Sequence, residues 1–176
     1  HRSVLLGDHG GGKSTLAQKI CYELAKNYKG RLAGGRLLTP VLVVLREYSF
    51  KKKDGSSIVQ FMEAEVTSKY QFPRGAPSGA FEYLLYNGHL LMIFDGLDEI
   101  PNRPRYEAMS RALNRLLENE WNAPRPHTLP NRYLVTCRAD DNQRLITGQL
   151  IALLPLEHAT ALKHYKRLRR RHRGDP

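Results

Sequence analysis

Residues 7–15 read Gly7-Asp8-His9-Gly10-Gly11-Gly12-Lys13-Ser14-Thr15 and fit the pattern G-x-x-x-x-G-K-[ST], which is typical of a phosphate-binding loop. Glycines let the backbone turn so that successive N–H groups point into one concavity, and a helix that begins at Lys13 adds the positive end of its dipole. The whole stretch is therefore predicted to contact phosphate. Lys13 is expected to reach the β- and γ-phosphates, Ser14 to ligate Mg²⁺, and Thr15 to donate to the α-phosphate.

The residues on either side of this loop favour the same interpretation. Residues 3–6 are predicted to form a strand, and residues 13–26 a helix, because Leu16, Ile20 and Leu24 recur every four residues. The alternative is a glycine-rich turn that occurs by chance. A strand before the loop and an amphipathic helix after it are what phosphate binding requires, so we favour the binding loop.

A second stretch, residues 90–99, reads Leu90-Leu91-Met92-Ile93-Phe94-Asp95-Gly96-Leu97-Asp98-Glu99. Its apolar part predicts a buried strand that ends in Asp95, which would aim a carboxylate at the Mg²⁺ held by Ser14. Asp98 and Glu99 follow at the carboxyl end of the strand, where ligands bind in open α/β sheets, and one of them could polarise an attacking water. The alternative is a solvated acidic turn.

A third stretch, residues 133–138, reads Tyr133-Leu134-Val135-Thr136-Cys137-Arg138 and predicts a strand that ends in a cation. If this strand lies between those that lead to Lys13 and Asp95, Arg138 would lie near the γ-phosphate. The alternative for Arg138 is a solvated loop, which is the common position of an arginine.

The rest of the chain alternates short apolar strands with segments of helix length. Further strands are expected at residues 41–45 and 150–154, and further helices at residues 58–69, between Ser78 and Gly88, and at residues 104–118 and 157–171. Loops are expected at residues 30–35, 51–55 and 122–131. This alternation predicts an α/β domain with a largely parallel sheet.

Together the runs GDHGGGKST, PVLVVLREYS, LLMIFDGLDEI and YLVTCRAD resemble a NACHT domain, a branch of the signal-transducing P-loop NTPases, over roughly residues 3–162. The most specific part is Asp95-Gly96-Leu97-Asp98-Glu99, since many P-loop ATPases instead place a glutamate directly after the aspartate. His9 departs from the family, which often has proline there.

The resemblance implies a three-layer fold with a parallel five-stranded sheet in the order 5-1-4-3-2 and helices on both faces. It also implies that Arg138 senses the γ-phosphate and that Asp98, ahead of Glu99, is the base that activates water. The implied domains are a nucleotide-binding core at residues 1–155 and the start of a helical subdomain at residues 156–176.

Composition limits the remaining classes of protein. The 176 residues carry 28 Lys and Arg against 17 Asp and Glu, a net charge of +11. Much of this excess lies after residue 162, and we expect residues 163–173 to be a solvated helical face; the alternative is contact with nucleic acid or an anionic membrane. Cys21 and Cys137 form no disulfide pattern, which suits a reducing cytoplasm. The chain is expected to be part of a longer polypeptide, and no apolar run has the length of a membrane span.

The motifs predict a domain that binds ATP with Mg²⁺ and hydrolyses it slowly by in-line attack of water. The resemblance further implies that the nucleotide acts as a switch for homo-oligomerisation in signalling or immune defence. No N-K-x-D motif occurs, which disfavours a Ras-type GTPase, although the resemblance leaves GTP open as the nucleotide. The alternatives are a P-loop phosphotransferase that acts on a small acceptor, and a scaffold that holds nucleotide without turnover.

Overall fold

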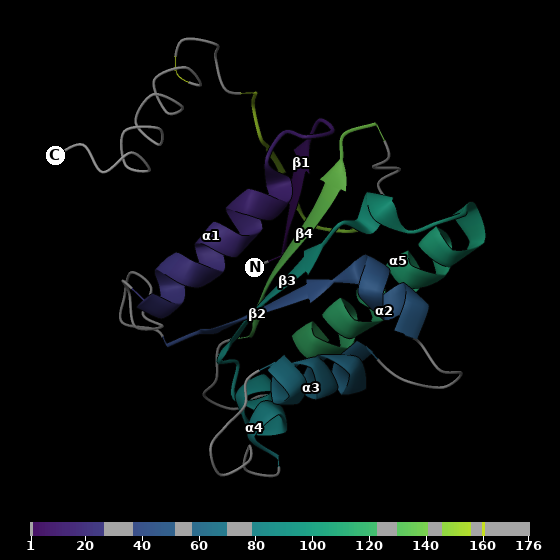
Figure 1. The fold of residues 1–176 in the computed structure, drawn as a ribbon. Coiled ribbons are helices and arrows are strands. Elements are labelled where there is room, and N and C mark those ends of the chain that lie inside the picture. The colour runs from purple at the N-terminus through teal and green to yellow at the C-terminus, as the bar shows by residue number, and fades with distance from the viewer. Residues whose placement is uncertain are drawn as a thin grey trace, which may run out of the picture.

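The computed structural model describes residues 2–26, 37–51, 58–69, 79–122, 130–140, 146–155 and 160. In this part of the chain one parallel sheet contains strands β1 (Arg2–Gly7), β2 (Thr39–Val44), β3 (Leu90–Asp95), β4 (Arg132–Arg138) and β5 (Gln149–Ala152). The strands lie in the order β2-β3-β4-β1-β5 (Figure 1). This is the order 5-1-4-3-2 read from the other edge, so the sequence-based prediction of the sheet is confirmed.

Helices cover both faces of the sheet, which gives the expected three layers (Figure 1). Of the helices in the described segments, α1 (Lys13–Lys26) covers one face. The other face carries α2 (Leu45–Lys51), α3 (Ile58–Lys69), α4 (Ala80–Tyr86) and α5 (Arg103–Asn122). A short 3-10 helix, η1 (Leu97–Glu99), follows β3 directly.

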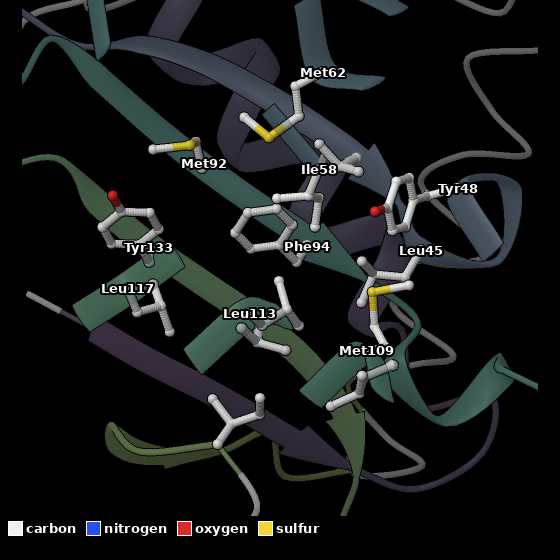
Figure 2. Close-up of a cluster of buried hydrophobic side chains, with 14 of the residues drawn as sticks. Leu45, Tyr48, Ile58, Met62, Met92, Phe94, Met109, Leu113, Leu117 and Tyr133 are labelled. Carbon is white, nitrogen blue, oxygen red and sulfur yellow. The ribbon is translucent and has the colours of Figure 1, made fainter. Parts of the chain in front are cut away.

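The larger core lies between the sheet and helices α2 to α5 (Figure 2). Consecutive side chains of a strand point to opposite faces, so Met92 and Phe94 enter this core whereas Ile93 packs against α1. All three side chains are fully buried. Burial of a side chain of this size stabilises the fold by about 1.5–3 kcal/mol. Leu113 and Leu117 of α5, four residues apart on one helical face, belong to this core (Figure 2).

The helix α2 was not predicted, and the preceding strand begins two residues earlier and ends one residue earlier than predicted. The sequence from Val41 to Leu45 is uniformly apolar, which indicated a strand that includes Leu45. The structure ends β2 at Val44, and Leu45 begins α2. Leu45 and Tyr48 are three residues apart and both buried, so a helical turn directs both into the core. A continuous apolar run does not reveal the point at which a strand becomes a helix.

Two other boundaries also differ from the prediction. The last strand covers Gln149–Ala152 instead of residues 150–154, and the Leu154 side chain is exposed. The helix α5 continues to Asn122, where the sequence indicated a loop. The next proline is Pro124, which disfavours helical geometry at the residue before it, so it allows the helix to continue as far as Asn122.

Asn131 lies at the end of the sheet opposite the phosphate loop, where its side chain connects β3 with α4. Its side chain is fully buried, accepts a hydrogen bond from the Leu90 N–H at 2.9 Å, and donates one to the Leu85 carbonyl at 2.7 Å. A buried amide whose donor and acceptor are both used stabilises its surroundings. Asn131 therefore fixes the end of α4 and the start of β3 beside the start of β4.

Some predictions fall outside the described residues. They are the loop at residues 30–35, residues 52–55 and 123–129 of the two other predicted loops, the position of Ser78, and the helix at residues 157–171 apart from residue 160. Lys51, predicted to begin a loop, instead ends α2. The boundary between domains at residues 155 and 156 thus stays a prediction. Across the described segments, no helix meets the requirements of length and apolarity for a membrane span.

Candidate phosphate-binding site

The loop between β1 and α1 has the backbone geometry that the sequence predicted. Gly10 and Gly12 have φ angles of 71° and 87°, in the left-handed region that favours glycine. The Gly11 N–H donates to the Asp8 carbonyl at 3.0 Å, and the Leu16 N–H donates to the Gly12 carbonyl at 2.8 Å as α1 begins. The loop is therefore a tight turn that ends at a helix N-terminus, the arrangement that binds anions.

Lys13, the first residue of α1, folds its side chain back over this turn. Its Nζ atom donates to the carbonyl oxygens of Gly7 and Asp8, each at 2.9 Å. The side chains of Ser14 and Thr15 are exposed. The loop therefore carries one ammonium group and two accessible hydroxyl groups.

A cavity of about 270 Å³ opens beside the loop. It brings together residues from three parts of the chain, which are His9, Gly10, Gly11, Gly12, Lys13, Ser14, Thr15, Gly96, Asp98, Glu99 and Thr136. Among the predicted site residues, Gly7, Asp8, Asp95 and Arg138 do not line it. Gly96 and Thr136 line it without having been assigned a role from the sequence.

Asp95 ends β3 beneath the cavity and is only 7% exposed. Its Oδ1 atom accepts a hydrogen bond from the Thr136 hydroxyl at 2.6 Å. The same hydroxyl accepts a hydrogen bond from the Gly96 N–H at 2.9 Å. The sequence signal for Thr136 was a polar residue inside an apolar strand, where Val135 and Cys137 are buried on either side.

Asp98 and Arg138 form an ion pair at the carboxyl ends of β3 and β4. The Arg138 Nε atom lies 2.9 Å from Asp98 Oδ2. The Asp98 side chain is 5% exposed, and that of Arg138 is 38% exposed. The other carboxylate oxygen, Asp98 Oδ1, is buried and has no hydrogen-bond partner among the described residues. A buried polar atom of this kind is costly unless a ligand, ion or water satisfies it.

Glu99 differs from Asp98 in its surroundings. It lies at the mouth of the cavity with its side chain 43% exposed, and its Oε2 atom lies 3.7 Å from the Arg46 Nη1 atom on α2. An exposed ion pair at this distance contributes little to stability. Of the two acids, Asp98 is therefore the one held in a fixed and largely dry position.

The chemistry of these donors fits Mg²⁺ bound together with phosphate. The Ser14 hydroxyl and the Asp95 carboxylate offer oxygen atoms, the donor type that Mg²⁺ prefers, and Mg²⁺ commonly takes one or two protein ligands in addition to phosphate oxygens and water. The part of the chain that the structure describes contains no cluster of three or more His, Cys, Asp or Glu residues that could hold a metal ion. The buried Asp98 Oδ1 atom could in addition accept a hydrogen bond from a ligand or a water molecule at the site.

The model of the NACHT domain matches residues 1–167, which is nearly the whole chain and includes every residue that lines the cavity. A search of curated proteins gives no significant match.

Proposed function

Because the chain belongs to the NACHT family of nucleotide-binding P-loop NTPases, we propose that it binds ATP with Mg²⁺ in the cavity beside Lys13 and hydrolyses it slowly. The observation that carries the proposal is the cavity itself. It combines the turn at Gly10–Gly12, the Lys13 ammonium and the acidic segment after β3 in one place. These groups match the charge and hydrogen-bonding needs of a phosphate chain and of water activation.

Binding follows from the groups on the loop. Backbone N–H groups of the turn and the Lys13 ammonium would donate to phosphate oxygens, and the two present acceptors of Lys13 are carbonyls that a phosphate can replace. Ser14 and Asp95 would hold Mg²⁺, which supplies neutralisation of the negative charge on the phosphates. The groups of the loop would contact the phosphates and not the base, so GTP is tested beside ATP.

Hydrolysis would use the acids after β3. A water oxygen forms a bond to the γ-phosphorus while the bond from that phosphorus to the β–γ bridging oxygen breaks, giving ADP and phosphate. Asp98 is proposed to accept the proton of the water through its unpartnered Oδ1 atom. Arg138 is proposed to place its guanidinium charge on the γ-phosphate, with Glu99 as a secondary acid at the cavity mouth.

A second candidate function is nucleotide binding without turnover. The observation that favours it is the ion pair between Asp98 and Arg138, which uses one oxygen of the proposed base and the Nε atom of the proposed sensor. Single-turnover assays with excess protein and γ-labelled ATP or GTP separate the two candidates. Slow release of free phosphate supports hydrolysis, whereas bound nucleotide that stays intact supports binding alone.

We also propose that the bound nucleotide controls homo-oligomerisation in a cytoplasmic signalling or immune-defence protein. This proposal is supported by membership of the NACHT family, whose members act as switches. Sedimentation velocity in ADP and in a non-hydrolysable ATP analogue tests it. Larger species in the ATP analogue are expected, and identical distributions would contradict the proposal.

A further inference from the structure

Thr136 is a buried hydroxyl-bearing residue between two buried apolar residues of β4. It is fully buried in β4, and its neighbours Val135 and Cys137 are each 1% exposed. Burial of a hydroxyl group without a hydrogen bond is unfavourable, whereas valine of nearly the same shape would be buried without that cost. The hydrogen bonds that the Thr136 hydroxyl group makes therefore indicate the role of this residue.

The direction of both Thr136 hydrogen bonds is fixed by the partners. An ionised carboxylate can only accept, so the hydroxyl proton points to Asp95 Oδ1 at 2.6 Å. A backbone N–H can only donate, so Gly96 donates to the hydroxyl oxygen at 2.9 Å. One hydroxyl group thus connects the last residue of β3 with the first residue of the turn that follows.

This connection lies just beyond the last pair of residues in the β3–β4 register. The pairing ends at Phe94 and Val135. Two residues after Phe94, Gly96 adopts a φ angle of 78°, and the chain turns toward Asp98. The side chain of Thr136, in place of further strand pairing, holds β3 and the turn against β4.

We propose that Thr136 is a positioning residue that orients the Asp95 carboxylate for Mg²⁺ bound with nucleotide. This inference rests on the proposed function, because it assigns a task within the same site. Residues that hydrogen-bond to a metal-binding carboxylate fix its orientation, and their loss typically lowers metal affinity by about 10–100-fold. Thr136 lines the cavity and acts through Asp95 in this proposal, so it is not assigned a catalytic role.

The test measures the affinity for a fluorescent ATP analogue in Mg²⁺ and in EDTA, and takes the ratio of the two as the Mg²⁺ dependence of binding. Thr136→Val keeps the shape but removes the hydroxyl, and we expect it to lower the Mg²⁺ dependence about tenfold with little change in EDTA. Thr136→Ser restores the hydroxyl and is expected to restore the dependence. Asn131→Ala serves as the matched control, since it removes two side-chain hydrogen bonds, one of them buried, at the far end of the same strands.

The outcomes separate this inference from the proposed function. An unchanged Mg²⁺ dependence in folded Thr136→Val overturns the inference, as does an equal loss in Asn131→Ala, which would show a purely structural effect. If Thr136→Val does not fold, a folded Thr136→Ser variant that has lost the Mg²⁺ dependence overturns it. If the wild-type chain binds no nucleotide at all, the proposed function fails first and the inference fails with it.

Discussion

Asp98 and Asp95 lie three residues apart and have different surroundings, so their removal should have different effects. Asp98→Asn keeps the shape but removes the proposed base, and we expect ATP to bind while hydrolysis slows roughly 100-fold. Asp95→Asn should mainly weaken Mg²⁺-dependent binding. Titration with a fluorescent ATP analogue and single-turnover phosphate release measure the two effects.

The matched control for this pair is Glu99→Gln, because Glu99 is the more exposed of the two acids after β3. It should slow hydrolysis less than Asp98→Asn does. If both aspartate variants lose binding and turnover to the same extent, the two roles are divided wrongly.

Arg138 gives a prediction about nucleotide discrimination. Its guanidinium group is now paired with Asp98, and the proposal assigns it to the γ-phosphate, which ATP has and ADP lacks. Arg138→Ala should therefore reduce the preference for ATP over ADP about tenfold, since a hydrogen bond to a charged group contributes roughly 1.5–3 kcal/mol. Competition titrations with both nucleotides measure the ratio. Equal weakening for ATP and ADP would place Arg138 away from the γ-phosphate.

At the scale of elements, we expect the side-chain hydrogen bonds of Asn131 to hold α4 and β3 beside the start of β4. Asn131→Ala leaves the buried Leu90 N–H without its partner and removes one of the hydrogen bonds to the Leu85 carbonyl, which together cost roughly 3 kcal/mol. For a chain of this size the Tm should fall by about 6–12 °C. Thermal unfolding followed by circular dichroism measures it.

Asn87→Ala is the matched control for that experiment. Asn87 donates to the Tyr83 carbonyl at 2.8 Å at the end of the same helix, but this hydrogen bond is exposed to solvent. Loss of this exposed hydrogen bond should cost much less free energy of unfolding than loss of the two Asn131 hydrogen bonds, because water replaces the missing partner. Similar Tm values for the two variants would show that Asn131 does not hold α4 and β3 beside β4.

The elements could be predicted from local pattern wherever the pattern is strong. The 14 residues of α1 have the predicted bounds because apolar side chains recur at helical spacing after a glycine-rich turn. The helix α2 was missed because Leu45 continues an apolar strand without a break. The packing of Leu45 and Tyr48 in the core, which favours the helical turn, depends on tertiary structure that the local sequence does not show.

The site could be predicted as a set of residues but not as a set of contacts. The motif and the acidic segment identified the loop and Asp98, which both line the cavity. Thr136 was missed because its role depends on Asp95 lying opposite on a neighbouring strand. The pairing of Arg138 with Asp98 likewise joins residues that are 40 positions apart, and no local pattern encodes it.

At the scale of the whole molecule, the basic C-terminal stretch should be separable from nucleotide binding. Neutralising Arg169, Arg170 and Arg171 is expected to leave ATP affinity unchanged, because charges farther away than about 8 Å are screened at physiological salt. These residues lie outside the described part of the chain, so the expectation rests on sequence alone. Titration of the triple variant with a fluorescent ATP analogue tests it.

The same variant also tests the alternative roles of this stretch. Unchanged binding of DNA and of anionic vesicles supports a solvated face. A drop in DNA affinity, with a salt slope reduced by roughly 0.9 per lost phosphate contact, would support a nucleic-acid contact instead. A drop in ATP affinity would show that the stretch contributes to the nucleotide site.

The central claim, that nucleotide binds through its phosphates at the loop around Lys13, is tested most directly by one titration. A fluorescent ATP analogue with Mg²⁺ is added to the wild-type chain, to Lys13→Ala, and to the control Lys19→Ala, a variant of an exposed lysine on the same helix outside the cavity. The account predicts that Lys13→Ala raises Kd roughly 100-fold or more, since charge-assisted hydrogen bonds to phosphate are lost, while Lys19→Ala binds like wild type. Unchanged affinity in Lys13→Ala, with an unaltered circular dichroism spectrum, would contradict the claim.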